Sequence, residues 1–191
     1  MNTSLTEQKK SWLILAGLWL VLLTLAVLRP LAVPDEGRYG EIGRWMLESG
    51  DWLTPRLNGI PFFHKPPYLY WLEAMSVATL GTHELALRLI PALHVGLMLV
   101  VLYVSARIIS TEQIARRAAM MLGTSLTFLI GGQYVNHDMA VAAWIGVAIW
   151  CFAFAFMAGA KPHALLARLT GRPLRHRPGR QLATHLLQLA A

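Results

Sequence analysis

The chain has little charge and almost no cysteine. Asp, Glu, Lys and Arg make up only 14% of its 191 residues, whereas 55% are hydrophobic, and the mean hydropathy is +0.47. A water-soluble domain of this size carries more charge and less apolar surface, so the composition indicates a membrane protein. The one cysteine, Cys151, lies in an apolar run. It excludes a disulfide within the chain and does not identify the redox compartment.

The sequence also lacks the motifs of nucleotide chemistry. No glycine-rich phosphate loop and no Asp-x-Asp metal pair occur in it. The net charge of +7 could suggest nucleic acid as a partner, but the segment 161–191 supplies six basic residues and no acid. The remainder is nearly balanced, which argues against a nucleic-acid surface. The basic tail is expected to be solvated or to meet anionic lipid.

Four apolar runs are long enough to cross a bilayer. They cover residues 11–28, 85–109, 118–135 and 139–160, and the third is the least apolar because it holds Thr, Ser and Gly. The sequence therefore predicts an all-α, polytopic membrane protein with four transmembrane helices. Lys9 and Lys10 before the first run would also suit a signal peptide, but that run is long and no small-residue cleavage site follows it. His94, inside the second run, is expected to contact a neighbouring helix.

Basic residues predict the orientation of these spans. They cluster before the first run (Lys9, Lys10), between the second and third (Arg107, Arg116, Arg117) and in the tail 161–191. By the positive-inside rule, residues 1–10 and the tail are cytoplasmic. The loop 29–84, with five basic and seven acidic residues, then faces outward.

The outer loop shows the pattern of amphipathic helices beside the membrane. Asp35 stands at an expected N-cap and Gly50 at an expected helix end, with apolar residues at helical spacing between them: Tyr39, Ile42, Trp45 and Met46. Arg44 is spaced to pair with Glu41 and Glu48. Further aromatic residues suit the headgroup depth of a bilayer: Trp52, Phe62, Phe63, Tyr68, Tyr70 and Trp71. The plain interpretation is a loop anchored at the membrane surface.

Three charged residues suggest chemistry at this face. Topology places Asp35, Lys65 and Asp138 on the outer side, and ionisable groups at the mouths of spans usually pair or serve a site. Lys65 precedes Pro66-Pro67 and could neutralise a lipid-linked phosphate, while a carboxylate could accept a proton from a hydroxyl. The alternative is that Asp35 only caps a helix and Lys65 only anchors the loop.

One long motif resembles a known family. "DEGRYGEIGRWMLESGDWLTPRLNGIPFFHKPPYLYW" is similar to the first outer loop of the bacterial branch of the protein O-mannosyltransferase superfamily (glycosyltransferase family 39-like), which includes the aminoarabinose transferases that modify lipid A. The similarity extends through "LALRLIPAL" and "NHDMA" and covers roughly residues 11–160. It implies part of a C-type glycosyltransferase fold in the bacterial inner membrane. Such an enzyme takes a sugar from a polyprenyl phosphate carrier on the periplasmic face.

The resemblance also implies residue roles. Asp35 matches the catalytic acid at the head of the loop, Glu36 is its partner in the motif, and Asp138 matches a second acidic position. Lys65 matches the lysine that contacts the carrier phosphate, and Arg38 and Tyr39 are assigned to the same binding site. His64 departs from the pattern, because many relatives have Glu there. A divalent metal at His64 is left open, and cofactors are otherwise unknown.

The resemblance stops at about residue 160. Relatives continue with more spans and a further outer domain, so the chain is expected to be the opening third of such an enzyme. A frameshift, a truncation and a genuine short terminus all remain open for the tail. Two functions are therefore predicted: a transferase to a lipid or protein acceptor, completed by further chain or by a partner, or a noncatalytic four-span protein or accessory subunit. A transporter is less favoured, because the charges lie at the membrane faces rather than at mid-span.

Overall fold

The computed structural model describes residues 2–28 and 30–160, so the predicted basic tail 161–191 lies outside the described residues. Seven helices and one small hairpin make up this part of the chain. In order they are α1 (Asn2–Val27), α2 (Asp35–Ser49), β1 (Arg56–Leu57), β2 (Ile60–Pro61), α3 (Tyr68–Leu80), α4 (Glu84–Ile109), α5 (Glu112–Gly123), α6 (Leu126–Gly131) and α7 (Asp138–Ala160). The predicted all-α class is confirmed.

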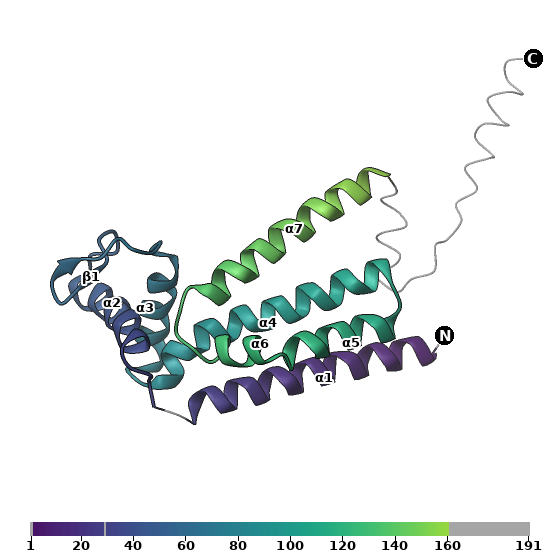
Figure 1. Ribbon diagram of the computed structural model, residues 1–191, viewed down its shortest axis with the longest axis horizontal. Coiled ribbons are helices and arrows are strands. Elements are labelled where there is room, and N and C mark those ends of the chain that lie inside the picture. The colour runs from purple at the N-terminus through teal and green to yellow at the C-terminus, as the bar shows by residue number, and fades with distance from the viewer. Residues whose placement is uncertain (1, 29, 161–191) are drawn as a thin grey trace, which may run out of the picture.

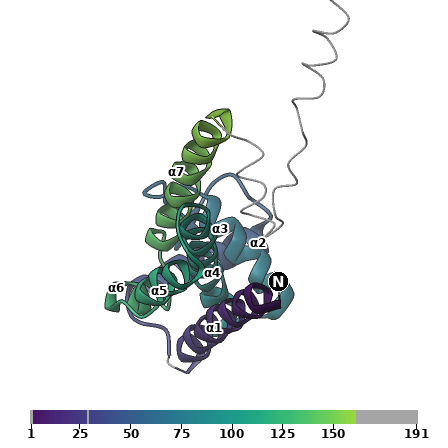
Figure 2. The same ribbon diagram turned by 90° about the vertical axis from the view of Figure 1, so that its right-hand side faces the viewer.

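The elements divide into a bundle and an outer cap. Figure 1 shows α1, α4, α5 and α7 running along the long axis, with α2, α3 and the hairpin gathered at one end. The view along the bundle shows α4 between α1 and α7 (Figure 2). The chain enters α1 and leaves α4 at the end opposite the cap. The cap is therefore the outer loop of the sequence prediction, folded onto one end of the bundle.

Three helices have the length and composition to cross a membrane. They are Leu5–Val27, Glu84–Ile109 and Asp138–Phe156. The third predicted span, residues 118–135, is not found as one helix within the described residues, because the chain breaks between α5 and α6. At the break, the Thr124 hydroxyl donates to the Met120 carbonyl and the Ser125 hydroxyl donates to the Leu122 carbonyl, both at 2.8 Å. Hydroxyls that bond to nearby carbonyls can weaken or bend a helix, which is consistent with the break at this point.

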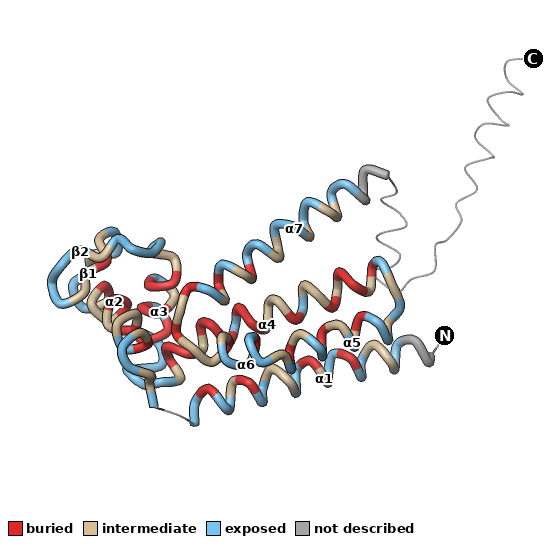
Figure 3. Tube along the Cα trace, viewed as in Figure 1, coloured by how far each residue is buried: buried red, intermediate tan, exposed pale blue. Residues whose placement is uncertain are grey.

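The bundle is packed through small residues and buried apolar side chains. A Cβ added at Gly123 would lie 2.2 Å from a methyl of Leu18, so a larger residue there would force the Leu18 side chain to move, whereas glycine lets the end of α5 lie close to α1. Figure 3 shows the buried positions of α1, α4 and α5 on the sides that face one another, while most of α7 is exposed. His94 is buried and its Nε2 lies 3.1 Å from the Tyr68 hydroxyl on α3, which confirms the predicted interhelical contact.

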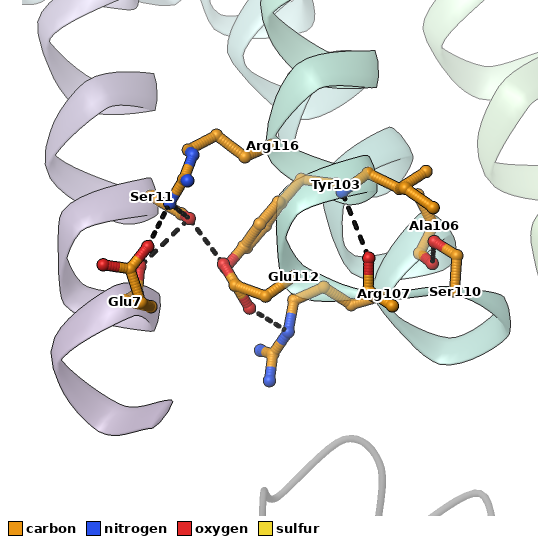
Figure 4. A network of polar contacts seen from close by, with 10 residues as sticks. Glu7, Ser11, Tyr103, Ala106, Arg107, Ser110, Glu112 and Arg116 are labelled. Atoms are coloured by element: carbon orange, nitrogen blue, oxygen red, sulfur yellow. Dashed lines mark hydrogen bonds and ion pairs between the residues drawn. The ribbon is translucent and has the colours of Figure 1, made fainter. Parts of the chain in front are cut away.

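A polar network joins α1, α4 and α5 at the end of the bundle away from the cap (Figure 4). The Glu112 carboxylate accepts a hydrogen bond of 2.6 Å from the Tyr103 hydroxyl and a short one from Ser11. It also forms an ion pair of 2.8 Å with Arg107. Three helices are therefore fixed to one carboxylate, which begins α5.

The apolar face of α2 packs against α3 within the cap. Ile42, Met46 and Tyr70 form a fully buried cluster, and a Cβ added at Gly43 would lie 3.0 Å from the Glu73 Cβ. The sequence predicted that this face would lie on the membrane, but α3 covers it. The predicted end of α2 is confirmed, since Gly50 adopts a left-handed φ of 73° after Ser49.

Candidate functional site

Two segments about 100 residues apart in sequence meet at the end of the bundle that carries the cap. They are the start of α2 and the segment 134–138 that leads into α7. The Tyr134 hydroxyl donates to Asp35 Oδ2 at 3.4 Å, and the Val135 N–H donates to Glu36 Oε1 at 3.1 Å. The Tyr39 and His137 rings meet edge to face at 5.3 Å. The structure thus brings together residues that the sequence could place only on the same side of the membrane.

Asp35 forms an ion pair with Arg38 one turn along α2. The side chains are 39% and 35% exposed, so a ligand can reach both. The expected N-cap role of Asp35 is wrong: the helix starts at Asp35 itself, after Pro34, and no side chain caps it. Asp35 is therefore free of helix capping and stands beside a cation at an accessible position.

Glu36 lies in a different environment, although it adjoins Asp35. Its side chain is fully buried and forms a two-pronged ion pair with the equally buried Arg88 of α4. Arg88 Nε donates to Glu36 Oε1 at 3.0 Å and Nη2 donates to Oε2 at 2.7 Å. The Glu36 carboxylate also accepts hydrogen bonds from the backbone N–H groups of Ala32 and Val135. This placement keeps Glu36 away from solvent, in contrast to Asp35.

The charges of Lys65 and Asp138 both act on His137. Lys65 is exposed in the loop before α3, and Asp138 is exposed at the start of α7. The Asn136 amide donates to the Asp138 carboxylate at 3.1 Å. His137 itself is buried, which lowers its pKa to about 4, and the positive charge of Lys65 acts in the same direction. The Pro66 backbone and Asp138 act in the opposite direction. His137 is therefore neutral at pH 7 and contributes no charge beside Lys65.

His64 is exposed, and its ring lies 4.5 Å from that of Phe62. Among residues 2–28 and 30–160, no group of three or more His, Cys, Asp or Glu side chains could hold a metal ion. The described part of the chain thus does not supply a set of three such ligands around His64, and a metal there stays a prediction.

The structure also shows buried polar groups that the sequence reasoning missed. Glu73 and Tyr70 are fully buried on α3, and neither the Glu73 carboxyl oxygens nor the Tyr70 hydroxyl has a hydrogen-bond partner among the described residues. Burial raises the pKa of both groups, that of Glu73 well above its usual range. The Tyr70 ring lies 4.9 Å from that of His137. The signal for Glu73 was an acid within the apolar run "YLYWLEAM".

Comparison with known families gives a match over much of the chain. The family model described as dolichyl-phosphate-mannose-protein mannosyltransferase matches residues 64–170. This range begins at His64, includes Lys65 and continues through α7.

Curated relatives cover more of the chain. It is 33% identical over 174 residues to an undecaprenyl phosphate-alpha-4-amino-4-deoxy-L-arabinose arabinosyl transferase of Pseudomonas fluorescens, which covers 87% of this chain and 29% of the relative. It is also 33% identical over 145 residues to the corresponding transferase of Pseudomonas savastanoi pv. phaseolicola, covering 73% and 27%. The chain therefore spans less than a third of the length of these relatives.

Solved structures agree with the sequence comparison. The crystal structure of ArnT from Cupriavidus metallidurans in the apo state aligns with a TM-score of 0.65 at 29% identity, covering 86% of this chain and 30% of that one. The structure of the same protein bound to undecaprenyl phosphate aligns with a TM-score of 0.62 at 31% identity, covering 72% and 26%.

Proposed function

Because the chain belongs to the dolichyl-phosphate-mannose-protein mannosyltransferase family, we propose that it forms the carrier-facing part of a membrane glycosyltransferase. The reaction is transfer of a sugar from a polyprenyl phosphate to a lipid acceptor such as lipid A, or to a protein. The observation that carries the proposal is the arrangement of accessible charged side chains at the cap end of the bundle. There, the accessible Asp35 and Arg38 adjoin the segment 134–138, and Lys65 lies exposed near His137.

The proposed roles follow from charge and exposure. Lys65 and Arg38 neutralise the carrier phosphate, which gains negative charge as the sugar leaves. Tyr39 lines the same site, since its ring contacts His137. Asp35 faces the electron-poor sugar carbon and accepts the proton of a hydroxyl acceptor. Asp138, exposed at the mouth of α7, is the second acid of this site.

The proposed membrane arrangement has four crossings. The broken pair α5 and α6 returns the chain from the end of α4 to the start of α7, and thereby serves as the third crossing. A non-helical break at membrane depth is tolerated where protein surrounds it. We place residues 1–10 in the cytoplasm, the cap in the periplasm, and the exposed aromatic residues of the cap at the headgroups of the inner membrane. Glycosylation-tag or cysteine-accessibility mapping at residues 5 and 53 tests this orientation.

Carrier binding is the first test. The chain in lipid nanodiscs is expected to bind undecaprenyl phosphate, and Lys65→Ala to weaken that binding at least tenfold because an ionic contact to phosphate is lost. Lys9→Ala, at the opposite end of α1, is the matched control and should bind like the wild type. Equal binding by Lys65→Ala and the wild type would contradict the proposed phosphate site.

Transfer is the second test. Proteoliposomes receive undecaprenyl phosphate-linked 4-amino-4-deoxy-L-arabinose and lipid A, and the product is followed by mass spectrometry. Asp35→Asn is expected to lower the rate about 100-fold or more while carrier binding persists. Carrier binding without any transfer by the wild type would favour the alternative of a noncatalytic membrane protein. The same assay with a chelator tests the metal left open at His64.

A further inference from the structure

Arg88 is a charged residue buried inside a helix of membrane-spanning length. It lies in the second turn of α4, near the cap, and its side chain has no exposed surface. A buried guanidinium is costly unless its N–H groups are matched by acceptors. Here they are matched from three directions. Two N–H groups reach Glu36, Nη1 donates to the Ala26 carbonyl at 2.6 Å, and Nη2 donates to the Pro30 carbonyl at 2.8 Å.

Glu36 extends the same junction to the rest of the cap. Its Oε2 accepts the Ala32 N–H at 2.6 Å, and its Oε1 accepts the Val135 N–H at 3.1 Å. One buried ion pair therefore connects the end of α1, the start of α2, α4 and the segment before α7. The hydrogen bond between Val135 and Glu36 alone joins residues 99 positions apart in sequence.

We propose that Arg88 is a positioning residue that, through Glu36 and these backbone groups, fixes Asp35 relative to the segment 134–138. This inference rests on the proposed function of Asp35. Asp35 directly precedes Glu36, and Tyr134 directly precedes Val135. The 3.4 Å contact between Tyr134 and Asp35 therefore lies directly beside the hydrogen bond from the Val135 N–H to Glu36, and the ion pair holds Glu36 in place.

Stability alone does not account for such a pair. Apolar residues of similar volume often replace a buried ion pair at no cost, whereas removal of one partner leaves an uncompensated charge. Apolar side chains cannot, however, accept the Val135 and Ala32 N–H groups or donate to the two carbonyls. An apolar replacement is thus expected to restore folding while it releases the segment before α7.

Spin-label distances can separate these two effects. The labels are placed by Gly37→Cys, where an added Cβ meets nothing within 4 Å, and by Val141→Cys on α7, which is exposed. Cys151 is replaced by Ser in the full chain, and distances are measured in nanodiscs. Arg88→Met is expected to lower the midpoint of thermal unfolding and to widen the distance distribution at least twofold.

The decisive variant removes both charges. Glu36→Leu/Arg88→Met is expected to recover most of the wild-type unfolding midpoint but to keep the widened distribution. Arg44→Met, which breaks a partly exposed ion pair on α2, is the control and should leave the distribution unchanged. A narrow, wild-type distribution in either Arg88 variant overturns the positioning role.

A kinetic readout links the position to the reaction. In the transfer assay, the double variant is expected to lower kcat at least tenfold while KM for the carrier changes less than twofold, because Lys65 is outside the junction. Equal kcat in the double variant and the wild type would overturn the inference. Failure of the proposed function looks different: the wild type then neither binds carrier nor transfers sugar, while the label distances still report whether Arg88 holds the two segments together.

Discussion

The network around Glu112 allows a stability prediction with a magnitude. Glu112→Ala removes the acceptor of the Tyr103 hydroxyl, and Tyr103 is fully buried. An orphaned buried hydroxyl costs about 1–3 kcal/mol. Ser11 contributes little to the loss, because its single hydroxyl proton can be donated instead to the Glu7 carbonyl, 3.1 Å away. The ion pair with Arg107 is partly exposed and adds about 0–1 kcal/mol. We expect a total loss of about 1–4 kcal/mol in the free energy of unfolding.

Reversible unfolding in mixed detergent micelles, followed by circular dichroism, measures this loss. Glu48→Ala is the matched control, because the Glu48 side chain is 58% exposed and its ion pair with Arg44 is expected to contribute less than about 0.5 kcal/mol. Tyr103→Phe combined with Glu112→Ala should regain about 1 kcal/mol or more, since no hydroxyl is then left unpaired. Equal stability of Glu112→Ala and Glu48→Ala, or no recovery in the double variant, would refute the reasoning.

Three further predictions concern the cap. Gly43→Ala should lose about 1–3 kcal/mol of unfolding free energy, because the added Cβ would lie 3.0 Å from the Glu73 Cβ. The control Gly37→Ala, where the added Cβ lies in open space, should gain about 0.5–1 kcal/mol. Equal changes for the two variants in denaturant titrations would argue against the close packing of α2 on α3. Burial lowers the pKa of His137 from 6.5 to about 4, so the unfolded state binds the extra proton and the contribution of His137 to stability should fall by up to about 3 kcal/mol from pH 6.5 to 4. The raised pKa of Glu73 acts in the opposite direction over part of this range, so the His137 contribution is measured as the difference between the wild type and His137→Leu in unfolding against pH. The exposed His64→Ala should follow the wild type. Glu73→Met should stabilise the protein by about 1 kcal/mol or more, because it removes a buried carboxyl with no partner among the described residues. The gain should grow as pH rises above 4.5, where an unfolded Glu73 ionises and the native one, with its raised pKa, does not; a loss of stability in the same titration would contradict this.

Features that depend on local spacing could be predicted from the sequence. Run length and hydropathy indicated the three long helices, although not the interruption at Thr124 and Ser125. Helical spacing indicated that Arg44 pairs with Glu41 and Glu48, and the structure confirms both pairs. Such interactions arise between residues within one or two turns, so the order of residues is sufficient to identify them.

Features that depend on tertiary packing could not be predicted in the same way. The apolar stripe of α2 is the same whether lipid or α3 covers it, so the sequence could not distinguish the two. Arg88 appeared as an isolated charge in an apolar run, and its partner Glu36 is 52 residues away. Adjacent acids also diverged: Asp35 is accessible while Glu36 is buried, and nothing in the pair "DE" indicates which one faces the protein interior.

The junction at Arg88 also has a consequence for the synthesis of the protein. Glu36 and the carbonyls of Ala26 and Pro30 precede Arg88 in the chain and thus, in the proposed orientation, reach the outer side of the membrane first. A charged residue disfavours insertion of a helix by about 2.5–3.5 kcal/mol at mid-span, and by less near its end. We therefore expect α4 to enter the membrane most readily once α1 and the outer loop are in place to receive its guanidinium. At this junction, the direction of translation sets the order of assembly.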